Sequence, residues 1–230
     1  MRAFRLLDDF VSLFYPRYCM SCHLSLVGGE DILCTRCIVD LPRTNYHLNS
    51  SPVKDRLHGR LPLKHGLAFL KFRKGGTVQK LLHELKYRQH PEVGVKLGKI
   101  YGKDLADAGL RNDLDLVVPV PLHRVRLRKR GYNQAAKFAE GISYALQIPM
   151  DESISVRKSN TSTQTSKTKL ERWENVKDVF AIHPQAVIAG KRVLLVDDVI
   201  TTGATMEACG QHLIQHGCAE LSVACIAEAQ

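Results

Sequence analysis

The sequence contains no long apolar run. No apolar stretch in its 230 residues approaches the roughly 18 positions that suggest a membrane span, and Asp8 and Asp9 interrupt the apolar start of the chain. A secretory signal needs an unbroken apolar segment, and that pattern is absent as well. We therefore expect a cytoplasmic protein without a membrane span.

Acidic residues are also in deficit. The chain has 33 lysines and arginines against 23 aspartates and glutamates, which gives a formal net charge of +10. Such an excess favours an anionic partner, either a polyphosphate or a nucleic acid. Few aromatic residues accompany the densest run of cations, where Tyr132 is the nearest. Base stacking of the kind used by single-strand-binding proteins therefore has little support.

Four of the seven cysteines form two closely spaced pairs. Two residues separate the cysteines within each pair, and eleven residues separate the pairs. In a cytoplasmic protein such pairs are more typical of metal ligands than of disulfides, and four thiolates complete a tetrahedral zinc site. We predict a small zinc-ribbon module that depends on its structural Zn²⁺ for folding, although four unligated thiols are the alternative. The predicted ligands are Cys19, Cys22, Cys34 and Cys37.

The apolar patterns divide the chain into three parts. Residues 1–50 combine a short amphipathic helix with the cysteine module, and the proline-containing, polar residues 51–65 are expected to form a linker. In residues 66–230, strand-like runs alternate with helical patterns, and no internal repeat is visible. This order predicts an α/β domain with a mostly parallel sheet flanked by helices.

The most informative stretch is residues 191–205. Four apolar residues predict a buried strand, and Asp197 and Asp198 follow where we expect it to end. A loop of small and hydroxylic residues then opens a helix, and its N–H groups would form an anion nest. Acids would repel a phosphate but can accept hydrogen bonds from sugar hydroxyls, so the pattern predicts a ribose 5-phosphate site, with a ligand-free turn as the alternative. The predicted phosphate-binding residues are Thr201, Thr202, Gly203, Ala204 and Thr205.

A second candidate site follows the strand predicted at residues 115–121. Five cations lie within residues 124–130, and their alternation with apolar residues predicts an ordered loop. Ligands of open α/β sheets bind beyond the carboxyl ends of strands, which favours binding of pyrophosphate or nucleic-acid backbone over a solvated face. Lys86 faces either solvent or substrate, and its spacing favours solvent. The candidate ligands are Arg124, Arg126, Arg128 and Arg130.

Residues 153–172 have a polar composition that cannot form a core. A mobile basic loop beside an anion site would suit a lid that excludes water. Gln164 and Lys167 are its candidate ligands. A plain disordered insertion is the alternative that composition leaves open.

The motifs and their order resemble a known family. Residues 197–205 resemble the phosphoribosyltransferase signature, in which paired acids hold ribose and the following loop holds the 5-phosphate of phosphoribosyl pyrophosphate (PRPP). The cysteine pairs, the Pro-Val-Pro-Leu-His-Arg run at residues 119–124, the Arg-Gly-Tyr-Asn-Gln run at 130–134 and this signature occur in one order. Together they resemble the competence-protein ComF family, with its ComFC- and GntX-type members. The resemblance implies a type I phosphoribosyltransferase fold behind a zinc finger, and a link to DNA uptake in natural transformation.

The resemblance also implies roles for the candidate residues. Mg²⁺ would bridge the pyrophosphate and ribose hydroxyls of PRPP, the arginines would hold pyrophosphate, and Asp197 and Asp198 would hold the ribose. Thr201 stands where hypoxanthine-type members carry an acid, which argues against purine-base chemistry. Three functions stay open: a phosphoribosyltransferase (pentosyl transfer) with an unknown acceptor, a non-catalytic PRPP sensor, and a single-stranded-DNA-binding competence protein. The oligomeric state, with a homo-oligomer as one alternative, and any DNA-uptake protein partner also stay open.

Overall fold

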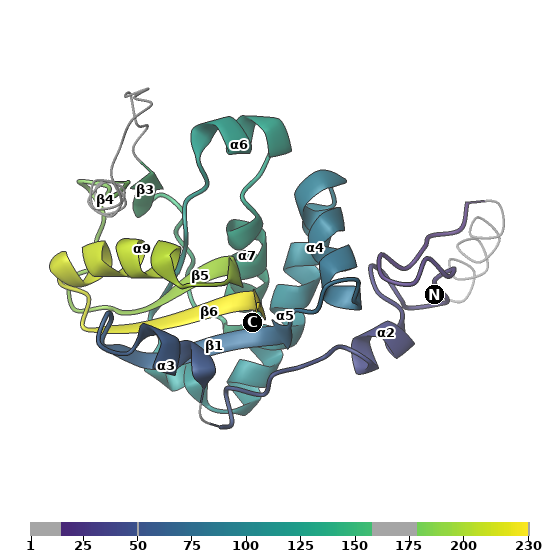
Figure 1. The fold of residues 1–230 in the computed structure, drawn as a ribbon, viewed down its shortest axis with the longest axis horizontal. Coiled ribbons are helices and arrows are strands. Elements are labelled where there is room, and N and C mark those ends of the chain that lie inside the picture. Colours follow the sequence, from purple (N-terminus) through teal and green to yellow (C-terminus); the bar gives the residue numbers. More distant parts are fainter. Residues whose placement is uncertain (1–14, 50, 158–178, 230) are drawn as a thin grey trace.

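The computed structural model describes residues 15–49, 51–157 and 179–229. Its centre is a four-stranded sheet in the order β1-β6-β5-β2, and all three neighbouring pairs are parallel (Figure 1). The predicted α/β fold with a mostly parallel sheet is therefore confirmed. The strands are β1 (Leu63–Lys71), β2 (Leu116–Pro119), β5 (Arg192–Ile200) and β6 (Glu220–Glu228).

Helices cover both faces of this sheet. In β5, Leu194 and Val196 pack into one core while Val193 and Leu195 pack into the other, because successive side chains of a strand point to opposite faces. None of the helices in the described ranges is long and apolar enough to cross a membrane. The first face, to which Leu194 and Val196 point, carries α4 (Thr77–Tyr87), α5 (Pro91–Asp107) and α7 (Gln134–Leu146). The second face, to which Val193 and Leu195 point, forms the second core and carries α3 (Pro52–Leu57) and α9 (Ala204–Gln215).

Shorter elements lie around these layers. A two-stranded antiparallel sheet pairs β3 (Ser155–Arg157) with β4 (Phe180–Ile182). Figure 1 shows α6 (Arg124–Arg130) as a separate short helix between β2 and α7. The remaining short helices are α2 (Thr35–Val39) and the 3₁₀ helix η1 (Leu110–Asp113).

Close packing of α5 against α7 fixes the start of α7. A Cβ on Gly98 would lie 2.2 Å from the carbonyl oxygen of Phe138, and a Cβ on Gly141 would lie 2.2 Å from that of Val95. Only glycine permits this approach of two helix backbones. At the start of α7, Asn133 accepts a hydrogen bond from the N–H of Ala135 (3.1 Å) and caps the helix. The segment that joins β2 to α7 is thereby anchored at its C-terminal end, where α7 begins.

Residues 51–65 are not the polar linker that the prolines suggested. They contain α3 and the start of β1, and the side chains of Val53 and Leu57 are fully buried. These two residues are four positions apart, so they lie on one helix face, and Pro52 occupies the first turn, where proline is tolerated. This segment therefore belongs to the second core.

Candidate functional site

The four predicted metal ligands come together in the structure. The sulfur atoms of Cys19, Cys22, Cys34 and Cys37 all lie within 4.8 Å of one another. The N–H of Cys34 donates to Cys19 Sγ and that of Cys37 to Cys34 Sγ, both at 3.4 Å. Such donors stabilise thiolates, the form in which cysteine binds a metal. The cluster could therefore hold a structural metal ion, and four sulfur donors suit zinc.

The loop of residues 201–205 joins β5 to the N-terminus of α9. Gly203 is the N-cap of α9 at φ +81°, and a Cβ there would lie 2.7 Å from Leu57 Cδ2. Thr202 Oγ1 accepts from the N–H of Ala204 (3.4 Å). Within the described part of the chain, the N–H groups of Thr202, Gly203 and Thr205 have no hydrogen-bond partner. These amides, at the positive end of the α9 dipole, form an anion-binding geometry.

The two acids lie inside β5, which continues to Ile200, and the prediction that the strand ends before them is wrong. Asp197 pairs in register with Cys225, a residue of the second core, whereas Asp198 forms an ion pair with Lys86 of α4 on the first face. The carboxylates therefore point to opposite faces of the sheet, as the two-residue period of a strand requires. The N–H of Asp198 donates to Asp197 Oδ1 (2.8 Å).

The environments of the two acids differ. Burial raises the pKa of Asp197 to about 7, and the negative charge of Asp198 adds to this effect, while Lys86 and Arg157 oppose it. Asp198 is shielded less, because its side chain is 20% exposed and Lys86 Nζ lies 2.8 Å from its Oδ2. The pair therefore combines one carboxyl whose pKa is raised toward neutral pH with one that is held by a cation.

The basic run of residues 124–130 forms helix α6, not the loop that its alternation predicted. His123 Nδ1 accepts from the N–H of Val125 (3.3 Å), and Gly131 ends the helix at φ +79°. Arginine, leucine and lysine are good helix formers, and three cations in the last turn suit the negative end of the helix dipole. Helix formation spreads the arginine side chains over different faces.

A small basic pocket of about 230 Å³ lies between α6 and the C-terminal end of α4. Arg126 and Arg130, four positions apart on α6, line it together with Lys86 and Tyr87 of α4. The Arg130 guanidinium lies over the Tyr87 ring, 5.5 Å from its centroid. Lys86 therefore faces this pocket and Asp198, and the expectation that it faces solvent is wrong.

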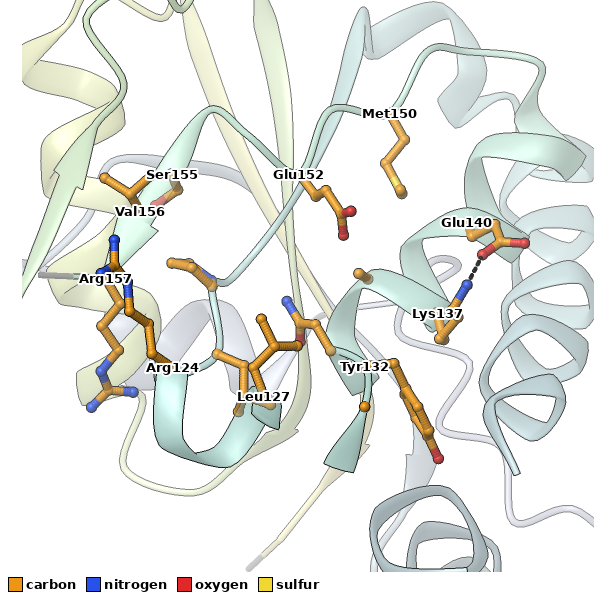
Figure 2. Close-up of a pocket in the computed structure, with 15 residues that line it drawn as sticks. Arg124, Leu127, Tyr132, Lys137, Glu140, Met150, Glu152, Ser155, Val156 and Arg157 are labelled. Carbon is orange, nitrogen blue, oxygen red and sulfur yellow. Dashed lines mark hydrogen bonds and ion pairs between the residues drawn. The ribbon is translucent and has the colours of Figure 1, made fainter. Parts of the chain in front are cut away.

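A larger cavity of about 570 Å³ lies on the other side of α6 (Figure 2). Figure 2 shows Arg124 and Arg157 on one wall, and Tyr132 and the ion-paired Lys137 and Glu140 on the opposite wall. Arg124 has no carboxylate partner among the described residues. The two walls therefore differ in charge, and the wall with the two arginines is suited to an anion.

Arg157, at the end of β3, is a candidate ligand that the sequence did not single out. Its Nε is buried without a hydrogen-bond partner, and its guanidinium lies 5.4 Å from the centroid of the Phe180 ring. Burial lowers the pKa of Arg157, and the nearby positive charge of Arg126 contributes. Two cations brought together in this way are stabilised by an anion between them. The only sequence signal was that Arg157 is one of the cations that flank the polar run within residues 153–172.

The structure thus brings together only part of the predicted set. The acids and the loop of residues 201–205 adjoin through β5, and Arg126 and Arg130 share a pocket with Lys86. Arg124 lines the larger cavity, and Arg128 is exposed and lines neither of these two pockets. Gln164 and Lys167 lie outside the described residues.

Comparison with known proteins identifies a domain family and several relatives. Residues 133–230 match the model of the phosphoribosyl transferase domain family. The chain is 26% identical over 231 residues to the DNA utilization protein YhgH of Escherichia coli (strain K12), covering 93% of this chain and 98% of the relative. It is 32% identical over 147 residues to competence protein F of Haemophilus influenzae, covering 62% and 64%.

Among solved structures, the chain is similar to one described as the allosteric regulatory enzyme of purine biosynthesis. The TM-score is 0.43 with 20% sequence identity, and the match covers 62% of this chain and 29% of that one. The matched domain and the parallel sheet define the chain as a protein with the type I phosphoribosyltransferase-like fold. Its similarity to proteins named DNA utilization protein and competence protein supports a relationship to the ComF family. The pocket residues of α4 and α6 precede the matched range, which begins at Asn133.

Proposed function

We propose that the protein binds PRPP and transfers its phosphoribosyl group to an acceptor. The observation that carries this proposal is the ion pair between Lys86 and Asp198, because it joins the signature strand to a basic pocket. The loop of residues 201–205 would take the 5-phosphate at the N-terminus of α9. The basic pocket would take the pyrophosphate, and Asp198 would accept hydrogen bonds from the ribose between them.

The remaining residues have supporting roles in this proposal. Asp197 would support the ribose-binding strand through its hydrogen bond with the N–H of Asp198. Arg157, whose charge interacts with that of Arg126, would add positive potential near the pyrophosphate as its bond to ribose C1 breaks. Arg124 lines the larger cavity across α6 and would not contact pyrophosphate held in the basic pocket. Mg²⁺, held by the oxygens of PRPP, would supply charge neutralisation of this leaving group, and the carboxylate and hydroxyl groups at this edge are of the kind that Mg²⁺ accepts. We further propose that Gln164 and Lys167 shield the site from water.

A comparison of arginines on one helix tests this function. Arg126→Gln/Arg130→Gln removes two cations from the basic pocket, whereas Arg128→Gln removes an exposed cation that lines neither pocket. Calorimetric titration with PRPP and Mg²⁺ should show affinity at least about tenfold lower in the double variant and unchanged in Arg128→Gln. Saturable binding by the wild type that is equally strong in all three proteins would contradict the proposed pyrophosphate site.

Binding of single-stranded DNA is a second candidate function. It is favoured by the exposed cations of α6, and Arg128 in particular has no ion-pair partner among the residues described. The names of the relatives, DNA utilization protein and competence protein, also favour this function. DNA backbone binding would depend on Arg128 as much as on Arg126, and its affinity would fall steeply with salt. The Arg128→Gln variant therefore separates the two functions. Both proposed functions, phosphoribosyl transfer and binding of single-stranded DNA, are compatible with a role in DNA uptake.

We also propose that Zn²⁺ is the metal held by the cysteine cluster. Residues 1–50 would then form the zinc module, and residues 66–230 the phosphoribosyltransferase-like domain. Residues 51–65 would belong to that domain, because α3 packs against the sheet. Metal analysis of the purified protein should find about one zinc per chain, and a cobalt-substituted sample should show the absorption of a tetrahedral thiolate site.

A further inference from the structure

Two arginines outside the matched domain hold the backbone of the candidate phosphate loop. Arg56 Nη1 donates to the carbonyl oxygen of Thr201 (2.6 Å), and Arg60 Nη2 donates to that of Thr202 (3.0 Å). Arg56 lies in α3, and Arg60 lies in the turn that follows this helix, within the segment that the sequence suggested to be a linker. Consecutive carbonyls of one short loop are thus bound by two arginines from α3 and the turn after it.

Each guanidinium is itself fixed by a carboxylate. Arg56 Nη2 donates to Glu228 Oε1 (2.5 Å), and Glu228 is only 3% exposed. The hydroxyl of Tyr46 donates to the other oxygen of Glu228 (2.7 Å). Arg60 Nη1 donates to Glu207 Oε2 (2.9 Å) in the first turn of α9. Since both arginines are held at two points, they are ordered before any ligand arrives.

The planarity of the peptide bond gives these contacts a consequence for the amides. In a trans peptide unit the C=O and the N–H point in opposite directions. The carbonyl of Thr201 shares its peptide unit with the N–H of Thr202, and the carbonyl of Thr202 shares one with the N–H of Gly203. Binding both carbonyls to the α3 side therefore turns both amides away from α3. These amides are among those of the loop without a partner in the described part of the chain.

We propose that Arg56 and Arg60 are positioning residues that preset the amides of Thr202 and Gly203 for a phosphate. This inference rests on the proposed function of the loop, and neither arginine touches the ligand. An anion nest without such support would have to order its peptide planes when the ligand binds, and this ordering lowers affinity. The segment around α3 is then part of the phosphate site.

Two variants remove the support without leaving a buried charge unpaired. Arg60→Gln frees Glu207, whose side chain is 17% exposed. Arg56→Gln/Glu228→Gln removes the guanidinium and its buried counterion together, since loss of one partner alone would destabilise the fold. Arg43→Gln is the matched control, because Arg43 forms a comparable ion pair with Asp104 of α5 at 2.6 Å and has no hydrogen bond to the loop.

Two measurements on the full-length, zinc-loaded protein test the inference. Hydrogen–deuterium exchange without ligand should become faster at residues 201–205 in both support variants and stay unchanged in Arg43→Gln. Affinity for ribose 5-phosphate should fall roughly tenfold, the factor that corresponds to the entropy cost of ordering about one backbone residue when the ligand binds. Affinity for inorganic pyrophosphate should stay the same, because this ligand would occupy the pocket between α4 and α6. A loss of stability alone would not produce this difference between the two ligands.

The outcomes separate this inference from the proposed function. Unchanged exchange at residues 201–205, or an equal loss of affinity for both ligands, would overturn the positioning role. If wild-type protein binds no ribose 5-phosphate, the proposed function fails, and the exchange rates still decide whether the arginines order the loop.

Discussion

Lys86 Nζ lies 2.8 Å from Asp198 Oδ2, and this ion pair joins the last turn of α4 to the signature strand β5. Both side chains are about one-fifth exposed, so the ion pair is only partly screened by solvent. A ribose that binds Asp198 must share that carboxylate with Lys86 or release the lysine toward the basic pocket. Lys86 thereby connects the ribose and pyrophosphate ends of the proposed ligand.

Lys86→Met should therefore weaken the binding of pyrophosphate and of PRPP. We expect a loss of roughly tenfold, because one cation is removed from a small pocket. Lys86→Arg should retain most of the affinity. Lys80→Met, at an exposed position of the same helix, is the control for the loss of a positive charge. Equal PRPP affinities in Lys86→Met and Lys80→Met, measured by calorimetry, would contradict a role for Lys86 in the site.

Gly203→Ala should destabilise the protein more than Gly75→Ala. Both glycines have positive φ, +81° and +78°, so each substitution carries the backbone strain of a side chain in that region. Only at Gly203 does the added Cβ also meet Leu57 Cδ2, at 2.7 Å, whereas nothing lies within 4 Å at Gly75. We expect about 1 kcal/mol for the strain alone and about 1 to 3 kcal/mol more for overpacking. Urea denaturation measures both, and equal losses would show that Leu57 moves away without cost.

Asp197→Asn should change the pH dependence of stability. Folding raises the pKa of Asp197 to about 7, whereas an unfolded aspartate titrates near about 3.9. Between these values the folded chain binds more protons than the unfolded chain, so the wild type loses stability as pH rises. The variant lacks this titration. The difference in free energy of unfolding, variant minus wild type, should therefore rise by on the order of 2 to 3 kcal/mol between about pH 5 and pH 8.

Asp115→Asn is the matched control for this titration. Hydrogen bonds from Arg192 hold the pKa of Asp115 below its ordinary value, so its stabilising effect is lost only as pH falls through the acid range. Between about pH 5 and pH 8 this variant should differ from the wild type by a constant amount. The same constant offset in Asp197→Asn would contradict the elevated pKa of Asp197.

Cys22→Ser should release the metal from the cysteine cluster, whereas Cys218→Ser should not. Cys22 belongs to the group whose sulfur atoms lie within 4.8 Å, and Cys218 packs at the edge of the second core. Because so small a module has little core of its own, loss of the metal should unfold it. Metal analysis and hydrogen exchange over residues 15–49 measure the two effects. Full zinc content in Cys22→Ser would show that this cysteine is not a ligand.

The sequence predicts the architecture because alternating strand-like and helical patterns determine a parallel sheet with helices on both faces. It misplaces elements where local patterns are ambiguous. The prolines of residues 51–65 suggested a linker in place of α3, whose Val53 and Leu57 are buried only because the sheet covers them. The alternation of cations with apolar residues in 124–130 predicted an ordered loop, although lysine and arginine are good helix formers. Asp197 and Asp198 were predicted to mark the end of the strand, although a strand can continue through partly buried acids at its carboxyl edge.

The sequence also indicates candidate site residues but not how they are grouped in space. The cysteine pairs and the loop of residues 201–205 are contiguous motifs, so their geometry follows from local spacing. Lys86, Arg56 and Arg157 approach the site through tertiary packing, over sequence separations that no local pattern encodes. The separation of Arg124 from Arg126 and Arg130 likewise follows from the helical geometry of α6.

The most direct test of the account is calorimetric titration of the zinc-loaded protein with PRPP and Mg²⁺, beside an Asp197→Asn/Asp198→Asn variant. The account predicts saturable binding by the wild type, weakened at least about tenfold in the variant because the ribose loses Asp198 as its charged hydrogen-bond acceptor. No binding by folded wild-type protein, or equal binding by both proteins, would contradict the proposed ribose-phosphate site.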